Sequence, residues 1–251
     1  MNESRHAILF KASDDEGLGE RDPYARQLES IGIHSHILPV VQFEFVNLDE
    51  LNTRLDHPDL YSGIIFSSPR CVEAVKMSIN DASLWTNHRA FVVGEKTAKD
   101  VYVQLGMIPE GQASGNGKDL SKFILEQDIT KPLLLPVGNL STDTIVTALR
   151  AGGLKVDQLV VYNTITNPKL EMLFRPIFDE FEVSFLLYFS PSGVDSTIPL
   201  FEKLKIDLNG LKIGAIGKTT EEALIRHSIQ PAFVAEKPNP ACYAKALQEI
   251  L

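Results

Sequence analysis

The sequence has few cysteines and no long hydrophobic run, and each shortage excludes a class of protein. Cys71 and Cys242 are the two cysteines in 251 residues, too few for a disulfide-stapled secreted scaffold. No apolar run approaches the roughly 18 residues that a membrane-spanning helix needs. The opening stretch, MNESRHAILFKASDD, has neither the apolar core of a signal peptide nor the acid-poor composition of a transit peptide. The sequence therefore predicts a cytoplasmic protein without membrane association.

Positive charge is also scarce. Lys and Arg total 24 against 33 Asp and Glu, for a formal net charge of -9. This balance argues against a nucleic-acid partner, because phosphate backbones are bound by basic surfaces. With this net charge, the protein can still bind an anionic small molecule, but only at a place where a few cationic side chains and backbone N–H groups lie close together.

Recognisable cofactor and metal motifs are missing as well. GQASGNGKD resembles a phosphate loop, but Asn116 stands where that pattern requires Gly, and Asp119 stands where it requires Ser or Thr. His34 and His36 share a strand face without Cys or carboxylate ligands beside them. No Ser/His/Asp arrangement is legible. We therefore expect neither a metal nor another cofactor.

What the sequence does contain is a repeat. FSSPR at 66–70 and FSPSG at 189–193 each close an apolar stretch and precede a helix-like run. Landmarks beyond them recur in the same order, at gaps equal to within one residue: Pro69, Gly94 and Pro109, then Pro191, Gly217 and Pro231. AILFKASDD at 7–15 and LLLPVGNLSTD at 133–143 form a second matching pair. Chance is a poor explanation for this register.

Short apolar strands that alternate with amphipathic helices are typical of parallel sheets covered on both faces. The fold class expected is α/β, with two doubly wound parallel-sheet domains joined by a two-stranded linker. Residues 1–38 and 170–251 are predicted to form one discontinuous domain, and 45–161 an inserted domain. Residues 39–44 and 162–169 are then the connecting strands, which predicts a hinge.

In such sheets, ligands bind at the carboxyl ends of the strands, where helices begin. Ser68 and Ser190 are suited to cap the helices that follow them, with Pro69 and Pro191 at the first helical position. Taken singly, each of these residues reads as an ordinary helix cap, and the lysines and arginines nearby as ordinary solvated side chains. The functional hypothesis depends on their shared place. The candidates for this edge are Ser68, Arg70, Thr97, Gly138, Asn139, Ser190, Ser192, Lys212, Thr219 and Thr220.

Tyr162 lies in the second connecting segment. Taken alone, it is typical of a packed strand aromatic. Its phenol, with a usual pKa of about 10, is also able to donate a proton to a leaving hydroxyl.

Nine motifs, in order and over residues 8–247, together resemble one family: DPYARQLESIG, LPVVQFEF, FSSPRCVEA, VVGEKTA, GNGKDL, LLLPVGN, VVYNT, YFSPSGV and AIGKTT. They are similar to uroporphyrinogen III synthase of the eukaryotic type. The resemblance implies two α/β domains joined by a two-stranded ladder, in a monomeric, cofactor-free lyase of heme biosynthesis. It also implies a substrate, hydroxymethylbilane, which is a linear tetrapyrrole with eight carboxylates.

The implied reaction removes the terminal hydroxyl of hydroxymethylbilane, inverts ring D and closes the macrocycle to uroporphyrinogen III with loss of water. A transient handover from the preceding hydroxymethylbilane synthase goes with it. By this resemblance Tyr162 matches the tyrosine that helps the hydroxyl leave, Arg70 an arginine beside it, and Lys212 a lysine near the third strand. The threonines and serines named above match a substrate cradle. Two positions depart from the pattern: Lys218 stands where Pro is frequent, and Val137 where Cys can stand.

Two alternatives remain open from the residues. A hinged two-domain module could bind a small anion without turnover, and Tyr162→Phe would then leave its function intact. A nucleotide-sugar transferase could share the architecture, but the diphosphate contacts that it needs are not found in the sequence.

Overall fold

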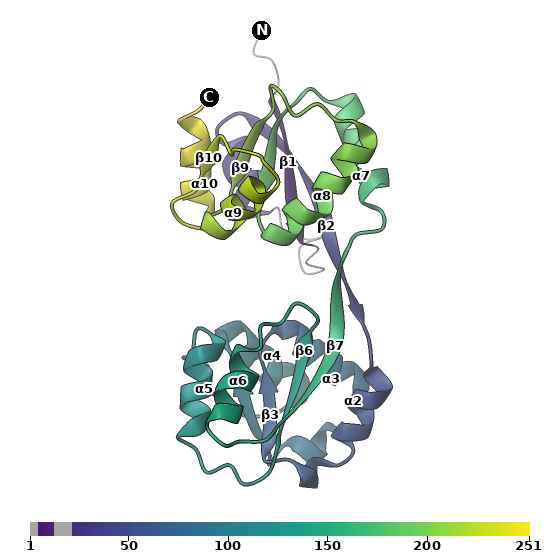
Figure 1. Cartoon of the computed structure of the whole chain (residues 1–251), viewed down its shortest axis with the longest axis vertical. Coiled ribbons are helices and arrows are strands. Elements are labelled where there is room, and N and C mark those ends of the chain that lie inside the picture. Colours follow the sequence, from purple (N-terminus) through teal and green to yellow (C-terminus); the bar gives the residue numbers. More distant parts are fainter. Residues whose placement is uncertain (1–4, 13–21) are drawn as a thin grey trace. The chain divides into compact units, whose positions relative to one another are not determined.

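The structure, a computed structural model, describes residues 5–12 and 22–251 of the chain. The end of the AILFKASDD motif, residues 13–15, lies outside the described residues. The chain divides into two units, shown in Figure 1. The discontinuous unit comprises Met1–Gln42 and Ile165–Leu251, and the inserted unit comprises Phe43–Thr164.

Both boundaries between the units fall inside strands, β2 (Ile33–Phe45) and β7 (Val156–Thr166). Residues 39–44 and 162–169, assigned above to connecting strands, therefore lie mostly within longer strands. Backbone hydrogen bonds tie β2 and β7 together at both ends. The Val46 N–H donates to the Val161 carbonyl at 3.0 Å, and the Asn167 N–H donates to the Val40 carbonyl at 2.9 Å.

The discontinuous unit alternates strands and helices. Besides β2, its strands are β1 (Arg5–Ala12), β8 (Val183–Tyr188), β9 (Lys212–Ala215) and β10 (Phe233–Val234). Its helices are α1 (Pro23–Glu29), α7 (Leu170–Glu180), α8 (Pro191–Leu204), α9 (Lys218–Arg226) and α10 (Pro240–Gln248).

The inserted unit repeats this alternation. Besides β7, its strands are β3 (Gly63–Phe66), β4 (Arg89–Val92), β5 (Pro109–Glu110) and β6 (Leu133–Gly138). Its helices are α2 (Leu48–Leu55), α3 (Pro69–Ser78), α4 (Gly94–Leu105), α5 (Gly117–Leu125) and α6 (Thr144–Ala151), with short 3-10 helices at Pro58–Leu60 and Ala82–Trp85.

The two units share one strand order. The discontinuous unit runs β2-β1-β8-β9-β10 and the inserted unit β7-β6-β3-β4-β5, with every neighbouring pair parallel. Taken in repeat order, each is a 2-1-3-4-5 doubly wound sheet, and its switch point lies between the first and third strands. FSSPR and FSPSG both follow the third strand, and therefore both lie at a switch point.

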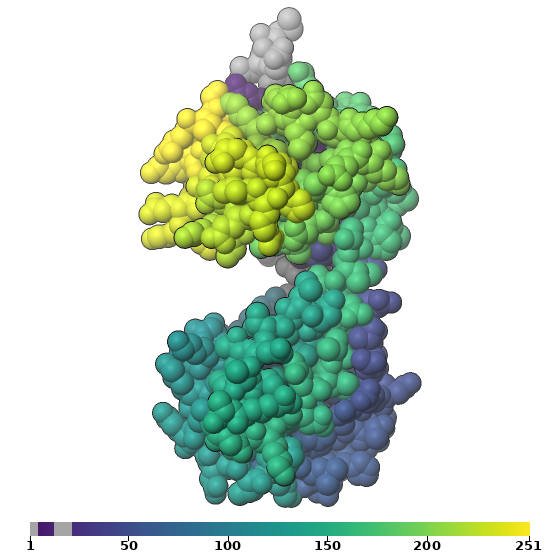
Figure 2. All heavy atoms as spheres, in the orientation of Figure 1, coloured from purple at the N-terminus to yellow at the C-terminus, as the bar shows by residue number. Residues whose placement is uncertain are grey.

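Alternating side chains divide each core into two layers. Ile64 and Phe66 of β3 pack with α2, α3 and α4, whereas Ile65 between them packs with α5 and α6 on the other face. In the discontinuous unit, α7, α8 and α9 cover one face and α1 and α10 the other. In Figure 2 the teal atoms of α5 and α6 and the blue atoms of α2 lie on opposite sides of the inserted unit. No helix in the described part of the chain is long and apolar enough to cross a bilayer.

The repeated Ser-Pro segments start equivalent helices. The Ser68 side chain accepts a hydrogen bond from the Cys71 N–H, and Ser190 accepts one from the Gly193 N–H at 3.1 Å. The proline that follows each serine takes the first helical position, where no N–H is needed. The repeated Ser-Pro segment thus forms the same strand-to-helix turn at the same place in both units.

Candidate functional site

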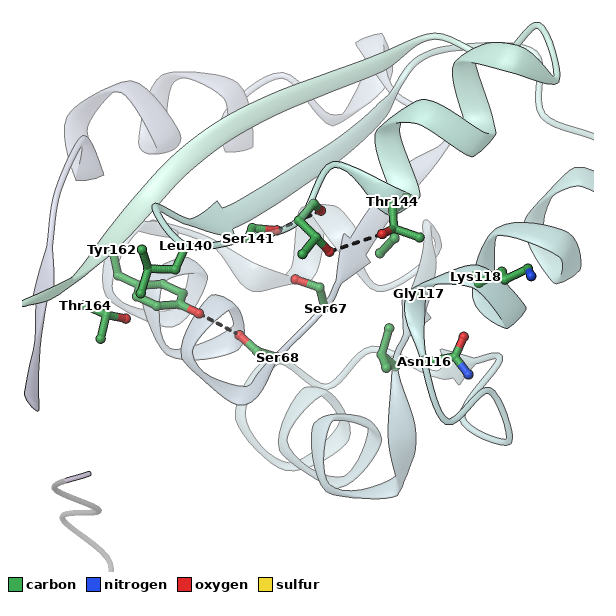
Figure 3. Close-up of a pocket in the computed structure, with 14 residues that line it drawn as sticks. Ser67, Ser68, Asn116, Gly117, Lys118, Leu140, Ser141, Thr144, Tyr162 and Thr164 are labelled. Carbon is green, nitrogen blue, oxygen red and sulfur yellow. Dashed lines mark hydrogen bonds between the residues drawn. The ribbon is translucent and has the colours of Figure 1, made fainter. Parts of the chain in front are cut away.

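A hollow of about 500 Å³ opens at the carboxyl edge of the inserted unit's sheet (Figure 3). Its walls come from both sides of the β6/β3 switch point. Among the described residues that line it, none carries a carboxylate, although the chain as a whole is acidic. The polar groups of the wall are those of Ser67, Ser68, Asn116, Lys118, Ser141, Thr142, Thr144, Tyr162 and Thr164.

Tyr162 reaches the hollow because the pairing of β6 with β7 changes register at its end. Val137 pairs with Val160, but Gly138 pairs with Tyr162, so Val161 is an extra residue on β7. Such a bulge changes the direction of a side chain near the end of a strand. The Tyr162 ring then lies across Gly138, where a Cβ would meet the ring carbon Cζ at 2.5 Å. Gly138 therefore makes room for the phenol.

Asn139 holds the backbone on either side of this tyrosine. Its N–H donates to the Tyr162 carbonyl at 3.0 Å, and its side-chain Oδ1 accepts from the Thr164 N–H at 2.9 Å. These two bonds continue the contact between the β6 loop and β7 beyond the regular pairing. Asn139 thus positions the strand that carries the phenol.

The Tyr162 hydroxyl points towards Ser68, as Figure 3 shows. The two oxygens lie 3.4 Å apart, which makes a long and weak hydrogen bond. Behind Ser68 is the buried thiol of Cys71, 3.3 Å from the Ser68 hydroxyl and 3.1 Å from the Pro136 carbonyl, which accepts a hydrogen bond from the thiol.

Arg70 lies beside the phenol. Its guanidinium stacks over the Phe43 ring at 4.4 Å and pairs with Glu73 at 2.7 Å. The Phe43 ring in turn meets Tyr162 edge-on, with centroids 5.9 Å apart. Arg70 is therefore held in place as a fixed positive charge near the phenol.

The surroundings of Tyr162 keep its phenol protonated. Burial raises its pKa above the usual 10.0, and the neighbouring Cys71 acts in the same direction. The Ser68 hydrogen bond and the Arg70 charge oppose this rise, because both favour the phenolate. The group is thus a proton donor at neutral pH.

The discontinuous unit has an equivalent edge of its own. Ser190 caps α8 and Ser192 lies in its first turn, with their hydroxyls 3.0 Å apart, and Thr219 is exposed in the first turn of α9. Of the candidates predicted from the sequence, these three offer hydroxyl groups at this edge.

Three other candidates present no polar group at the surface of these edges, although Thr97 and Thr220 lie in the first turns of α4 and α9. Thr97 and Thr220 are only 2% and 1% exposed and face the core. Lys212 begins β9, at the amino end of the strand, and its ammonium donates to the Ile250 carbonyl. The expectation that Lys212 lies at the ligand edge needs correcting. The sequence places this lysine near the Gly217 turn, but the length of β9 separates the two.

Several residues of the hollow were missed from the sequence. Asn116, Lys118, Thr142, Thr144 and Thr164 line it, and none was chosen as a candidate. In the sequence, Asn116 is visible only as a departure from the phosphate-loop pattern. The feature that could have identified Asn116 is its position as the N-cap of α5, where its Oδ1 accepts from the Asp119 N–H at 3.0 Å.

An unpredicted cluster of imidazoles lies at the other end of the discontinuous unit. His6 Nδ1 lies 3.0 Å from His36 Nε2, and the His6 ring stacks on His34 at 5.4 Å. Only the pair on β2 is visible in the sequence, because pairing with β1 brings in the third. Within residues 5–12 and 22–251, no group of three or more His, Cys, Asp or Glu side chains could hold a metal ion.

Comparison with known proteins agrees with the resemblance. The family model described as uroporphyrinogen-III synthase HemD matches residues 22–243. The uroporphyrinogen-III synthase of Schizosaccharomyces pombe is 30% identical over 244 residues, covering 90% of this chain and 91% of the relative. That of Saccharomyces cerevisiae is 26% identical over 254 residues, covering 90% and 91%.

Solved structures share the fold. The uroporphyrinogen-III synthetase of Helicobacter pylori superposes with a TM-score of 0.66 at 17% identity, covering 98% of this chain and all of that one. A mutant enzyme from Thermus thermophilus gives 0.56 at 21% identity, covering 98% and 96%. The predicted α/β fold of two doubly wound domains is thereby confirmed. The alternative of a small-anion binding module finds no support. The chain belongs to the uroporphyrinogen-III synthase family.

Proposed function

We propose that this chain catalyses the reaction for which its family is named, the closure of hydroxymethylbilane to uroporphyrinogen III, and that Tyr162 acts on the departing hydroxyl. The observation that carries this proposal is the half-buried Tyr162 phenol at the wall of a hollow without carboxylates. The hollow receives the end of the substrate that bears the hydroxyl.

The character of the wall suits a substrate with many carboxylates. Hydroxyl and amide groups can donate hydrogen bonds to a carboxylate, each contributing about 1.5–3 kcal/mol. A carboxylate in the wall would repel the substrate, and the described wall residues include none. Binding therefore depends on many moderate contacts rather than on a single ion pair.

The proton of Tyr162 leaves with the hydroxyl. Electrons of the terminal pyrrole expel the hydroxyl group, and the phenol supplies the proton that converts it to water. The resulting phenolate is stabilised by the Ser68 hydroxyl and by the Arg70 charge, the two groups that oppose the rise in its pKa. The phenolate regains a proton when the new pyrrole linkage loses one, so that one water is the net product.

Most of the selectivity comes from orientation. Without a protein the linear tetrapyrrole closes with ring D uninverted, so the enzyme must hold the reacting carbon against the far ring. Fixing two reacting groups in a productive geometry contributes several kcal/mol or more to a rate. Gly138 and Asn139, which position Tyr162, belong to this function as much as residues that touch the substrate.

Three finer parts of the proposal rest on the sequence and the family resemblance. The enzyme works in the cytoplasm, acts as a monomer, and takes its unstable substrate from the synthase that makes it by a transient handover. Light scattering of the purified protein tests the second part, and a dimer at micromolar concentration would contradict it.

An isomer assay tests the activity. Freshly generated hydroxymethylbilane is supplied, the product is oxidised, and type I and type III uroporphyrins are separated by chromatography. We expect a type III excess that scales with protein concentration and is lost in Tyr162→Phe. Type I alone, formed at the rate without protein, would refute the proposed function.

A further inference from the structure

Cys71 is buried directly behind the Tyr162–Ser68 pair, in a chain of contacts that ends at the backbone of β6. The thiol donates its single proton to the Pro136 carbonyl at 3.1 Å, an oxygen that can only accept. Its sulfur is then left with lone pairs alone on the side of Ser68, 3.3 Å away. Neither the family resemblance nor the candidate residues above give this cysteine a role.

This arrangement gives the contacts a direction. With the sulfur as acceptor, the Ser68 hydroxyl is satisfied by donating to Cys71. The Ser68 oxygen, which also accepts from the Cys71 N–H, can then use its second lone pair to accept from the Tyr162 hydroxyl, 3.4 Å away. In the opposite arrangement, the Ser68 hydroxyl donates to the phenol oxygen. No hydrogen then lies between Ser68 and the Cys71 sulfur, so that contact is no longer a hydrogen bond. The two arrangements differ only by rotation of two hydroxyl hydrogens.

We propose that Cys71 is a positioning residue that holds the Ser68 hydroxyl away from Tyr162 at rest and releases it when the phenol gives up its proton. Sulfur is a weak acceptor, so release is easier than it would be from an oxygen. Once released, Ser68 donates to the phenolate. Burial raises the pKa of the Cys71 thiol, so the proton stays on the sulfur and its hydrogen bond stays directed at the Pro136 carbonyl throughout.

The proton count of the reaction is unchanged by this step. Tyr162 passes its proton to the departing hydroxyl, which leaves as water, and Ser68 turns from sulfur to phenolate without losing its own proton. When the phenolate is protonated again by the substrate, Ser68 returns to Cys71. The inference deepens the proposed function and rests on it for the identity of the proton acceptor.

The test measures the titration of the phenol itself, which needs no substrate. 3-Fluorotyrosine is placed at position 162, and its 19F resonance is followed against pH in the wild-type protein, in Cys71→Ala and in Cys71→Ser. In Cys71→Ala the Ser68 hydroxyl has no sulfur to bond and can donate to the phenolate at once. We therefore expect the acid dissociation constant of the residue 162 phenol to be about threefold higher than in the wild type. Cys71→Ser, which keeps a rotatable acceptor, should lie closer to the wild type.

Two comparisons separate this role from simple packing. On a Ser68→Ala background, Cys71→Ala should shift the titration much less than it does in the wild type, because the group that it frees is absent. Cys242→Ala, at a partly buried cysteine of α10, is the matched control and should change nothing. An unchanged midpoint in Cys71→Ala, or an equal shift with and without Ser68, would overturn the inference.

Turnover gives an independent check. The alkaline limb of the kcat profile in Cys71→Ala should move to lower pH while KM stays within about twofold of the wild type. A protein that shows the titration shift but makes no type III isomer would refute the proposed function and leave the role of Cys71 standing. If Cys71→Ala does not fold, Cys71→Ser is compared with Ser68→Ala instead. Identical titration midpoints of the residue 162 phenol in these two variants would contradict the inference.

Discussion

Gly138 and Tyr162 lie in direct contact at the end of the β6–β7 pair, and the phenol ring covers the position where a side chain on Gly138 would begin. A Cβ there would come within 2.5–2.7 Å of two ring carbons and the hydroxyl oxygen of Tyr162. The aromatic ring is rigid and partly buried, so it can avoid such a Cβ only by moving as a whole. The position of the phenol thus depends on the absence of a side chain at Gly138, directly beside the reacting hydroxyl.

Gly138→Ala should therefore impair catalysis more than stability. We expect kcat/KM for hydroxymethylbilane to fall by about 10-fold to 100-fold, because a displaced donor loses much of its effect on the departing hydroxyl. The measurement is steady-state kinetics with isomer analysis. Gly115→Ala is the matched control, since a Cβ there meets nothing within 4 Å. Equal losses in the two variants would contradict the role given to Gly138.

The pH dependence of turnover should follow the protonated phenol of Tyr162. The pKa of this group is raised above its usual 10.0, and the active form is the protonated one. Activity limited by this group is then fully present at neutral pH and is lost only as the pH rises above 10. In Tyr162→Phe this alkaline limb should be absent and kcat lower by about 10²-fold to 10⁴-fold, the range typical of a lost general acid. A limb that survives in the variant would assign it to another group.

Much of the fold could be predicted because the sequence repeat indicates the same order of strands and helices in both units. The Ser-Pro turns, the glycines that follow the next strands and the final prolines recur in register, and this is what a duplicated sheet requires. The alternation of Ile64, Ile65 and Phe66 between two core layers also follows from strand periodicity.

The site was less accessible from the sequence, for two physical reasons. A strand has two ends, and nearness in sequence does not say which end a residue occupies. The sequence pattern therefore predicts the wrong edge for Lys212, which is the first residue of β9. The β-bulge that brings Tyr162 opposite Gly138 depends on pairing between distant segments. Thr164 and Thr144 join the hollow for the same reason, since they are separated by the whole of α6 and most of β7.

A partly buried polar network at the start of β7 should stabilise the inserted unit. Asp157 accepts from the Arg54 guanidinium at 3.0 Å and from the Tyr61 hydroxyl at 2.6 Å. Asp157→Asn removes the charge that both donors face, and we expect a loss of about 1–3 kcal/mol in the free energy of unfolding. Trp85, the one tryptophan of the chain, is 1% exposed in this unit and reports its unfolding in urea by fluorescence.

Asp128→Asn is the control for this measurement, because Asp128 is exposed in the same unit. We expect its unfolding midpoint to stay within error of the wild type. If both variants lose the same stability, net charge rather than the contacts of Asp157 would be the cause.

The imidazole cluster should make the discontinuous unit sensitive to mild acid. Burial, together with the nearby imidazoles, lowers the pKa of His6 and His36 below their usual 6.5, and the Phe181 ring packs against both. The unfolded chain therefore binds protons more readily than the folded one. The stabilising contribution is fully present above pH 6.5 and is lost as the pH falls below it. Calorimetry should show a lower melting temperature at pH 5.5 than at pH 7.5, with a smaller difference in His36→Asn. His57→Asn, at an exposed histidine outside the cluster, should retain the full wild-type difference, and a reduced difference there would show that the acid sensitivity does not arise from the cluster.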